Sequence, residues 1–384
     1  DQLQLRSHRL RQSGGFHIEV VTMWLNIAMF VGSLIVVLWA SEPLAAGLDR
    51  LGSKLHLSDA VLGLLVALGA DSPEICSAIV ALVSNQRDLG VGIVLGSNLF
   101  NLAALLGLGA VVAGQVSANS AGTILHGVVA IAVTLVAGAL IADIFDPLTS
   151  LIVLLLLVVP YIYILTVGAT AVERLPLPNS WKIHLARACN SAKTETSKIG
   201  YANQQRQRRK AESGGESTAK SWRPVFWIVP AIGAIVLGST GLIRGATALG
   251  QHWLPHPVLG TFVLAGLTGL PNSFTAIRLA RHGKGSAVIT ETFNSNTINI
   301  LLGLALPALV VGQGSLNALT LLDLLWLLLL TAVAVVLTAH AGKLTRKQGT
   351  LLIALYLVFV GTWIAVFTSG GHSVIGRAGG KYHG

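Results

Sequence analysis

The chain has 384 residues, of which 53% are hydrophobic and only 11% are charged, and its formal net charge is +10. So few polar side chains cannot cover a water-soluble globule of this size, which excludes an ordinary soluble protein. The composition therefore predicts a membrane protein that crosses the bilayer several times.

Apolar stretches of spanning length, about 20 residues each, follow one another along the chain. We expect them at 21–41, 58–83, 89–112, 121–142 and 148–170, and then at 224–246, 257–280, 286–313, 318–340 and 349–368. They predict an all-α polytopic membrane protein of about ten transmembrane helices in two sets of five. We find no nucleotide-binding loop, His-Glu-x-x-His run or convincing serine elbow, so we expect no enzyme.

The distribution of positive charge predicts the orientation. Most of the 26 Lys and Arg residues fall in loops that share one side with residues 171–223. The positive-inside rule makes 171–223 a cytoplasmic basic linker and puts both termini outside, as external segments 1–20 and 371–384. The five-helix halves are then 21–170 and 224–370. Because five is odd, the second half crosses in the opposite sense and the repeats are inverted. We expect a bacterial plasma membrane.

The linker contains the basic run Arg206, Arg208, Arg209 and Lys210. Such a run could bind anionic lipid or a regulatory partner, although a loop that merely sets the topology is the plainer interpretation. We expect inorganic cations and the lipid bilayer as partners, no nucleic acid, no cofactor, and no disulfide between Cys76 and Cys189.

Residues 63–114 reappear without a gap at residues 261–312. The alignment places Pro73 on Pro271, Ser97 on Ser295, Asn98 on Asn296 and Asn101 on Asn299. Transporters built from structural repeats carry their binding site where such copies meet near the bilayer midplane. The repeat therefore predicts a shared site.

The second stretch is interrupted by polar residues at Asp71, Ser72, Pro73 and Glu74. Asp or Ser before Pro is typical of a helix start, so we expect the helix to break here and restart at midplane. A break in the bilayer is tolerated where it lines a cavity, and an intramembrane carboxylate is functional by default. We expect Glu74 to face that cavity, while Asp71 either joins it or only caps the turn.

Neutral oxygen ligands follow in the next stretch, where Ser97 and Asn101 lie four residues apart on one helical face. The second repeat offers a matching set, which consists of Thr268, Asn272 at a corresponding helix break, Ser295 and Asn299. Glu291 shares a helical stripe with Ser295 and Asn299 and either joins the cavity or stays hydrated near the helix end. Asn101 and Asn299 could instead be interhelical hydrogen-bond partners. Oxygen ligands of these kinds suit calcium and sodium.

Other polar residues in or beside the helices receive plainer interpretations. We expect His126 to be a packed, hydrogen-bonded side chain, Asp143 and Asp146 to sit in a short external loop, and Asp323 to lie near a membrane interface.

The two units resemble the alpha-repeats of the sodium/calcium exchanger family, within the cation/calcium exchanger superfamily. The first keeps Pro73-Glu74 and the whole run from Gly96 to Asn101. The resemblance implies ten helices with outward termini, and it makes Glu74, Ser97, Asn101, Thr268 and Ser295 ion ligands. The second repeat diverges, because Asn272 replaces the family's second glutamate and Glu291 stands where the family has Asn.

We therefore expect a secondary cation antiporter that exchanges calcium for sodium or protons by alternating access around a midplane site. The redistributed carboxylates keep two alternatives open. One is a monovalent sodium or potassium exchanger, and the other is a non-transporting sensor or scaffold.

Overall fold

The computed structural model describes residues 2–55, 59–118, 120–167, 223–253, 255–312 and 316–378, with isolated positions between 172 and 186. Most of the expected linker, 171–223, lies outside the described residues. Nine helices in the described part are long and apolar enough to cross a membrane, and the shorter apolar helix 72–83 adds to them. The polytopic helical fold expected from composition is confirmed.

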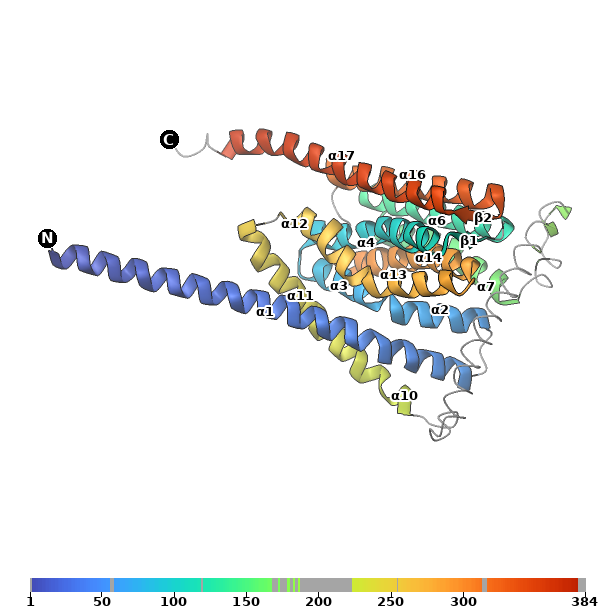
Figure 1. Cartoon of the computed structure of the whole chain (residues 1–384), viewed down its shortest axis with the longest axis horizontal. Coiled ribbons are helices and arrows are strands. Elements are labelled where there is room, and N and C mark those ends of the chain that lie inside the picture. Colours follow the sequence, from blue (N-terminus) through green and yellow to red (C-terminus); the bar gives the residue numbers. More distant parts are fainter. Residues whose placement is uncertain are drawn as a thin grey trace.

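Helices α1 (Gln2–Lys54) and α11 (Ile228–Trp253) cross at one side of the bundle (Figure 1). Helix α1 is longer than the expected 21–41, because the backbone stays helical on both sides of the apolar run. Close approach depends on glycines of α11: a Cβ at Gly241 would lie 2.2 Å from Ser33 Oγ, and one at Gly245 would lie 3.0 Å from Phe30 Cα. Small residues at such crossings bring two membrane helices close together.

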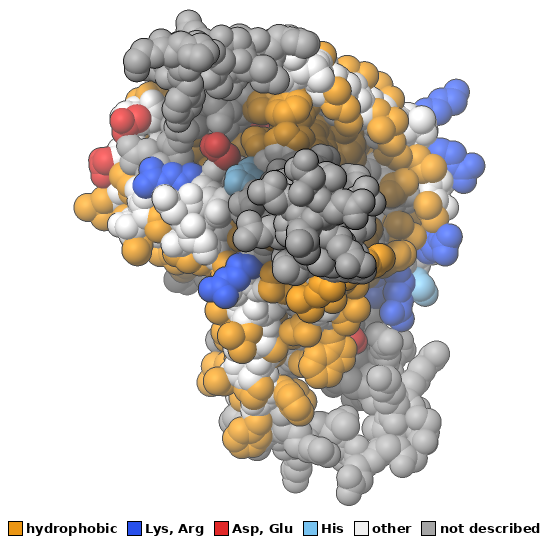
Figure 2. Space-filling model, turned by 90° about the vertical axis from the view of Figure 1, so that its left-hand side faces the viewer, with side chains coloured by type: hydrophobic (Ala, Val, Ile, Leu, Met, Phe, Trp, Pro, Cys, Tyr) orange, Lys and Arg blue, Asp and Glu red, His pale blue; other side chains and the backbone are white. Residues whose placement is uncertain are grey.

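The outer surface of these helices is apolar. Trp24 and Trp39 of α1 are 61% and 65% exposed, and Val229 and Leu237 of α11 are 76% and 75% exposed. Figure 2 shows that hydrophobic side chains cover much of the described surface on the face that carries the start of α1 and the end of α17. Exposed apolar area of this extent suits contact with lipid acyl chains.

Each half contributes two interior helical segments. In the first half they are α2 (Asp59–Ala70) with α3 (Ser72–Val83), and α4 (Arg87–Asn101) with η1 (Leu102–Leu108) and α5 (Gly109–Ala113). In the second half they are α12 (His256–Val258) with η3 (Leu259–Leu264) and α13 (Ala265–Arg281), and α14 (Gly285–Ile300) with η4 (Leu301–Ala305) and α15 (Leu306–Val311). The boundaries follow the expected apolar stretches within a few residues.

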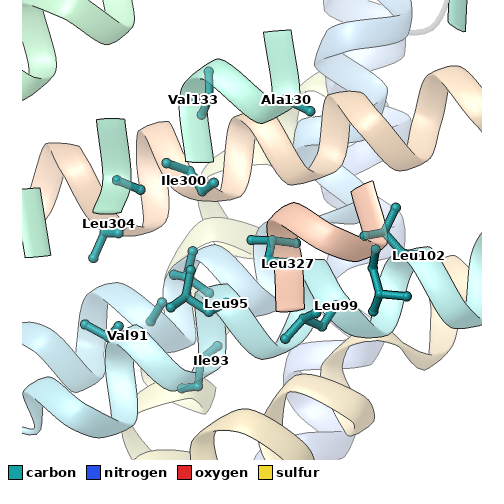
Figure 3. Close-up of a cluster of buried hydrophobic side chains, with 14 of the residues drawn as sticks. Val91, Ile93, Leu95, Leu99, Leu102, Ala130, Val133, Ile300, Leu304 and Leu327 are labelled. Carbon is teal, nitrogen blue, oxygen red and sulfur yellow. The ribbon is translucent and has the colours of Figure 1, made fainter. Parts of the chain in front are cut away.

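Helix α4 lies at the centre of the bundle, and the membrane span to which it belongs, Arg87–Ala113, is 94% buried over its most apolar 18 residues. Figure 3 shows part of the core, in which Val91, Ile93, Leu95, Leu99 and Leu102 of α4 and η1 lie among Ala130, Val133, Ile300, Leu304 and Leu327 of other helices. A helix buried on all sides can carry polar residues only if the fold supplies partners for them. This arrangement places Ser97 and Asn101 away from lipid.

The outer helices α6 (Ser120–Ile141), α7 (Pro147–Val167), α16 (Ala318–Ala341) and α17 (Arg346–Ala378) surround this interior, and α10 (Arg223–Phe226) precedes α11. Two short strands, β1 (Gln115–Ser117) and β2 (Lys343–Thr345), pair antiparallel with Val116 opposite Leu344. The ribbon was not expected from the sequence and joins the connections that precede α6 and α17. The start of α1 and the end of α17 lie at the same end of the bundle (Figure 1).

In the described part of the chain three segments are π-helical, η1, η3 and η4, and two of them occupy matching positions in the repeats. Segment η1 begins directly after Asn101, and η4 begins two residues after Asn299. A π-helical turn adds a residue to the helix and is frequent at functional sites. The added residue changes the direction in which the following side chains point. The polar residues before the π-helical turn and the apolar residues after it can therefore face different neighbours.

Candidate functional site

The second transmembrane segment is interrupted at Asp71, as expected. The interruption is one residue long, since Asp71 N still donates to Ala67 O at 2.8 Å and Ile75 N donates to Asp71 O at 3.1 Å. Pro73 has no N–H, and the Ser72 hydroxyl donates to Gly69 O at 2.7 Å. The Asp71 side chain makes no capping hydrogen bond to α3. Its carboxylate is therefore free to contact the other half of the molecule.

Asn272 of α13 makes that contact. Its Nδ2 donates to Asp71 Oδ1 at 2.7 Å and lies 3.3 Å from Glu74 Oε1. Asp71 is 2% exposed and Glu74 is 1% exposed, so both carboxylates are removed from water. One amide thus bridges two buried carboxylates across the two repeats.

The second repeat does not break at this position, contrary to the expectation for Asn272. Helix α13 continues through Pro271 from Ala265 to Arg281. The Ser273 hydroxyl donates to Gly269 O at 3.1 Å, one turn back along the same helix. A single Pro without the Asp-Ser pair that precedes Pro73 is therefore accommodated inside a continuous helix.

Four asparagines join α4 to α14. Asn98 Nδ2 donates to Asn296 O at 3.0 Å, and Asn296 Nδ2 donates to Asn98 O at 3.1 Å. Asn101 Nδ2 lies 3.3 Å from Asn296 Oδ1, and Asn299 Nδ2 lies 3.2 Å from Asn98 Oδ1. Each bond has a counterpart in the other repeat, so the contact follows the two-fold relation that the alignment predicts.

Ser295 connects the asparagines to the carboxylates. Its hydroxyl accepts from Asn101 Nδ2 at 3.0 Å, and it also interacts with the Asp71 carboxyl group. The interacting side chains therefore form one network, with members from α3, α4, α13 and α14 and from the break at Asp71.

Buried oxygen atoms in this network lack hydrogen-bond partners. Asp71 Oδ2, Glu74 Oε2, Asn101 Oδ1 and Asn299 Oδ1 are all enclosed, and none accepts a hydrogen bond from the protein. An unsatisfied buried polar group costs about 1–3 kcal/mol, so four in one region require an explanation. All four are acceptors, the atoms that bind hard cations such as calcium and sodium.

The remaining expected residues lie around this network in different ways. The hydroxyls of Ser97 and Thr268 are buried and donate to carbonyls of their own helices, Val94 O at 3.0 Å and Leu264 O at 2.7 Å. Their oxygen lone pairs remain able to accept. Glu291 is half-buried, and its charge interacts with that of Asp71.

Carboxylates alone do not form a metal centre here. Within the described ranges, no three His, Cys, Asp or Glu side chains converge closely enough to hold an ion. Any cation at this position would therefore need the amide, hydroxyl and carbonyl oxygens as well. Such a mixed oxygen set is ordinary for calcium and for sodium.

The structure also places two other polar residues that the sequence singled out, His126 and Asp323. His126 is packed as expected, with Nδ1 2.5 Å from Tyr161 Oη and Nε2 3.3 Å from Thr290 Oγ1. The Tyr161 hydroxyl donates to Asn294 Oδ1 on α14, which the sequence did not indicate. Asp323 was expected near a membrane interface. Its side chain is 3% exposed and therefore buried inside the protein, which the sequence did not indicate.

A comparison with protein families decides which group this architecture represents. The sequence matches the model described as sodium/calcium exchanger protein over residues 25–169 and 224–365, well over half of the chain. The chain belongs to the sodium/calcium exchanger family. The resemblance seen in Pro73-Glu74 and in the run from Gly96 to Asn101 is thereby confirmed.

Curated relatives of this family member differ in how much of it they cover. Inner membrane protein YrbG of Escherichia coli (strain K12) is 24% identical over 290 residues, which are 75% of this chain and 81% of YrbG. The putative antiporter CaxA of Alkalimonas amylolytica is 33% identical over 101 residues, 26% of this chain and 32% of CaxA. Sodium/potassium/calcium exchanger 4 of Homo sapiens is 31% identical over 157 residues, 37% of this chain and 23% of that protein.

The fold of this family member is similar to a solved structure of the sodium-calcium exchanger NCX_Mj, soaked with 10 mM Na+ and zero Ca2+. The TM-score is 0.54 at 19% sequence identity, and the match covers 88% of this chain and 99% of NCX_Mj. At this identity the likeness shows the fold alone, a polytopic helical bundle with two repeats.

Proposed function

We propose that the protein is a secondary active antiporter that exchanges calcium for sodium or protons. The observation that supports this most directly is the set of buried acceptor oxygens on Asp71, Glu74, Asn101 and Asn299. They lie where the two halves meet, and alternating access requires a site that both halves share. The family of the chain and the fold of NCX_Mj agree with such a transporter.

The charge at the site suits a divalent ion. Asp71 and Glu74 supply two carboxylates in one buried region, close to the charge that calcium needs when it leaves water. The hydroxyls of Ser97, Thr268 and Ser295 would add neutral oxygens, and Asn101 and Asn299 would add amide oxygens. In this proposal Asp71 acts as a ligand and not as a helix cap.

A monovalent cation exchanger is the second candidate, and Asn272 favours it. The amide Nδ2 of Asn272 occupies one oxygen of Asp71 and approaches one of Glu74. An N–H group repels a cation and leaves fewer free oxygen acceptors. This disfavours calcium, which takes six to eight oxygen ligands. If Asn272 does not rotate to present its oxygen, sodium or potassium fits better than calcium.

We place the two halves at 21–170 and 224–370 on either side of a cytoplasmic linker, with both termini outside a bacterial plasma membrane. The start of α1 and the end of α17 lie at the same end of the bundle, which supports the placement of both termini on one side of the membrane (Figure 1). The relative YrbG is described as an inner membrane protein, which supports the location.

Ion flux in proteoliposomes tests the proposal. Purified protein should accumulate labelled calcium when a sodium or proton gradient is imposed, and it should not do so without a gradient. Labelled sodium and potassium are measured in parallel. Uptake of monovalent ions alone would favour the second candidate, and no gradient-driven uptake of any of these cations would contradict both.

A further inference from the structure

A further buried carboxylate lies outside the candidate cation site. Asp323 of α16 is 3% exposed, and its Oδ2 accepts a hydrogen bond from Thr261 Oγ1 of η3 at 3.2 Å. Trp363 of α17, 1% exposed, also interacts with this carboxyl group. Asp323 Oδ1 and Trp363 Nε1 nevertheless both lack a close hydrogen-bond partner.

No positive charge offsets this carboxylate among the described residues that surround it. Tyr356 of α17 is a titratable neighbour on which the negative charge of Asp323 acts, and a phenol carries no positive charge. Segment η3 contains no ionisable residue, and α4 carries Arg87 and Asp88 only at its exposed start. A carboxylate charge held in such a place is costly, and the uptake of one proton removes it.

The groups around Asp323 also argue against a metal ion. Thr261 and Trp363 approach it with an O–H and an N–H, which are hydrogen-bond donors, whereas calcium and sodium require several oxygen acceptors. A single carboxylate among donors can hold a proton, but it offers too few oxygens to enclose a hard cation.

We propose that Asp323 is a proton-binding site, separate from the cation site formed by Asp71, Glu74 and the asparagines. The reaction is the uptake of one proton by the carboxylate to give the neutral acid. The ionised form accepts the hydrogen bond from Thr261 with the Trp363 indole nearby, and the neutral form suits the apolar surroundings.

The site is connected to the cation site through a tight helix contact. A Cβ at Gly96 would lie 2.2 Å from the backbone oxygen of Thr261, so η3 packs directly against α4 one residue before Ser97. A charged carboxylate accepts a stronger hydrogen bond than a neutral acid. Protonation of Asp323 therefore weakens its hold on Thr261 at a contact that adjoins Ser97, and the bound proton can act on the cation site from here.

Infrared difference spectroscopy of the purified full chain tests this inference without any transport assay. The wild-type protein is titrated with acid and base, with and without sodium or calcium, and the carbonyl stretch of protonated carboxylic acids is followed. Asp323→Asn should remove one titrating component that the added cations do not displace. Thr261→Val removes a donor to the ionised form, so this component should move to higher pH by about one unit or more.

Asp88→Asn is the matched control, because it alters an exposed carboxylate on α4 and should leave the component unchanged. Identical titrations for wild type and Asp323→Asn would overturn the proposal, as would a component that sodium or calcium displaces. If Asp323→Asn does not fold, an unshifted component in Thr261→Val would overturn it instead. Because the readout is independent of flux, its failure is distinguishable from failure of the proposed antiport.

Discussion

Asn98 and Asn296, which occupy matching positions in the two halves, donate their side-chain amides to each other's backbone carbonyl oxygens at 3.0 Å and 3.1 Å. Each amide also accepts one bond from an asparagine of the opposite half, Asn299 for Asn98 and Asn101 for Asn296. Polar side chains that bond across membrane helices hold those helices in register. The pair therefore fixes α4 against α14 beside the carboxylates.

The first prediction follows from the matching hydrogen bonds of Asn98 and Asn296. Asn98→Ala and Asn296→Ala should each lower the free energy of unfolding in detergent by about 1–2 kcal/mol, and by similar amounts. Gln115→Ala, at an exposed strand position, is the control and should have little effect. A loss for either asparagine variant no larger than that of the control would show that these bonds do not hold the halves together.

Glu74→Gln should abolish most cation transport. The substitution keeps the shape of the side chain and removes one of the two carboxylate charges of the site, which leaves Asp71 alone beside the Asn272 amide. We expect gradient-driven uptake to fall at least about tenfold, the equivalent of about 1.4 kcal/mol. Asp88→Asn removes an exposed carboxylate and should leave uptake unchanged. Wild-type flux in a correctly folded Glu74→Gln protein would remove Glu74 from the mechanism.

Part of this site was predictable because local sequence determines it. The Asp-Ser-Pro-Glu run interrupts an apolar stretch, and its break at Asp71 follows from the preference of those residues for a helix start. The periodicity of four between Ser97 and Asn101 placed both on one face of a helix. The alignment of the two repeats then predicted that the corresponding helices of the two halves lie close together.

The rest depends on contacts between residues far apart in the sequence. That Asn272 bonds Asp71 at 2.7 Å could not be read from either segment alone, since it requires the packing of α13 against α3. The continuous helix through Pro271 could not be predicted either, because a lone proline is compatible with a broken helix or with a bent one. The partner of Asp323, Thr261, lies 62 residues away and carries no sequence signal.

The loop before α7 gives a prediction on pH. Asp146 Oδ1 accepts from the backbone N–H groups of Leu148 and Thr149, at 3.0 Å and 3.1 Å, and the Thr149 hydroxyl donates to Oδ2. The hydrogen bonds from Thr149 hold the pKa of Asp146 below its ordinary value. Since the folded pKa is the lower one, this contribution to stability is full above the unfolded value, about 3.9. It is lost as the pH falls through the folded value.

Asp146→Ala should therefore lower the unfolding temperature at neutral pH, and the difference from wild type should shrink as the solution is acidified below about pH 4. Asp143→Asn changes another exposed carboxylate in the same loop and serves as the control. Thermal unfolding at several pH values measures both. A difference for Asp146→Ala that stays constant from neutral to acid pH would show that the charged cap makes no contribution.

The orientation of the chain can be tested with reporters. A reporter fused near Ser213 should be cytoplasmic and one at Gly384 external, because most Lys and Arg residues lie in loops on the side of the linker. Accessibility of each fusion in intact cells measures this directly. If both reporters lie on one side of the membrane, the inverted arrangement of the halves fails.

The last prediction concerns the charge that Asn272 removes from the second repeat. Glu291 is half-buried and interacts electrostatically with Asp71, which Asn272 contacts directly. Asp71 and Glu74 balance a divalent ion in full only when both are ionised, and Glu291 adds negative charge beside Asp71 at a depth where uncompensated charge costs several kcal/mol. Glu291→Gln should weaken calcium uptake, and adding Asn272→Glu should restore part of it.

That partial recovery is expected because residues that share one site combine non-additively, so moving a carboxylate is tolerated better than deleting it. Calcium uptake by wild type, both single variants and the double variant measures the coupling. Asn317→Gln, on a residue whose amide reaches the exposed Asp88 at 3.4 Å, is a polar control remote from the site. If Glu291→Gln transports calcium normally, Asp71 and Glu74 alone balance the ion, and the half-buried Glu291 lies outside the site. If only sodium or potassium moves and neither change affects it, the monovalent alternative holds, because a single-charged ion does not need the additional carboxylate.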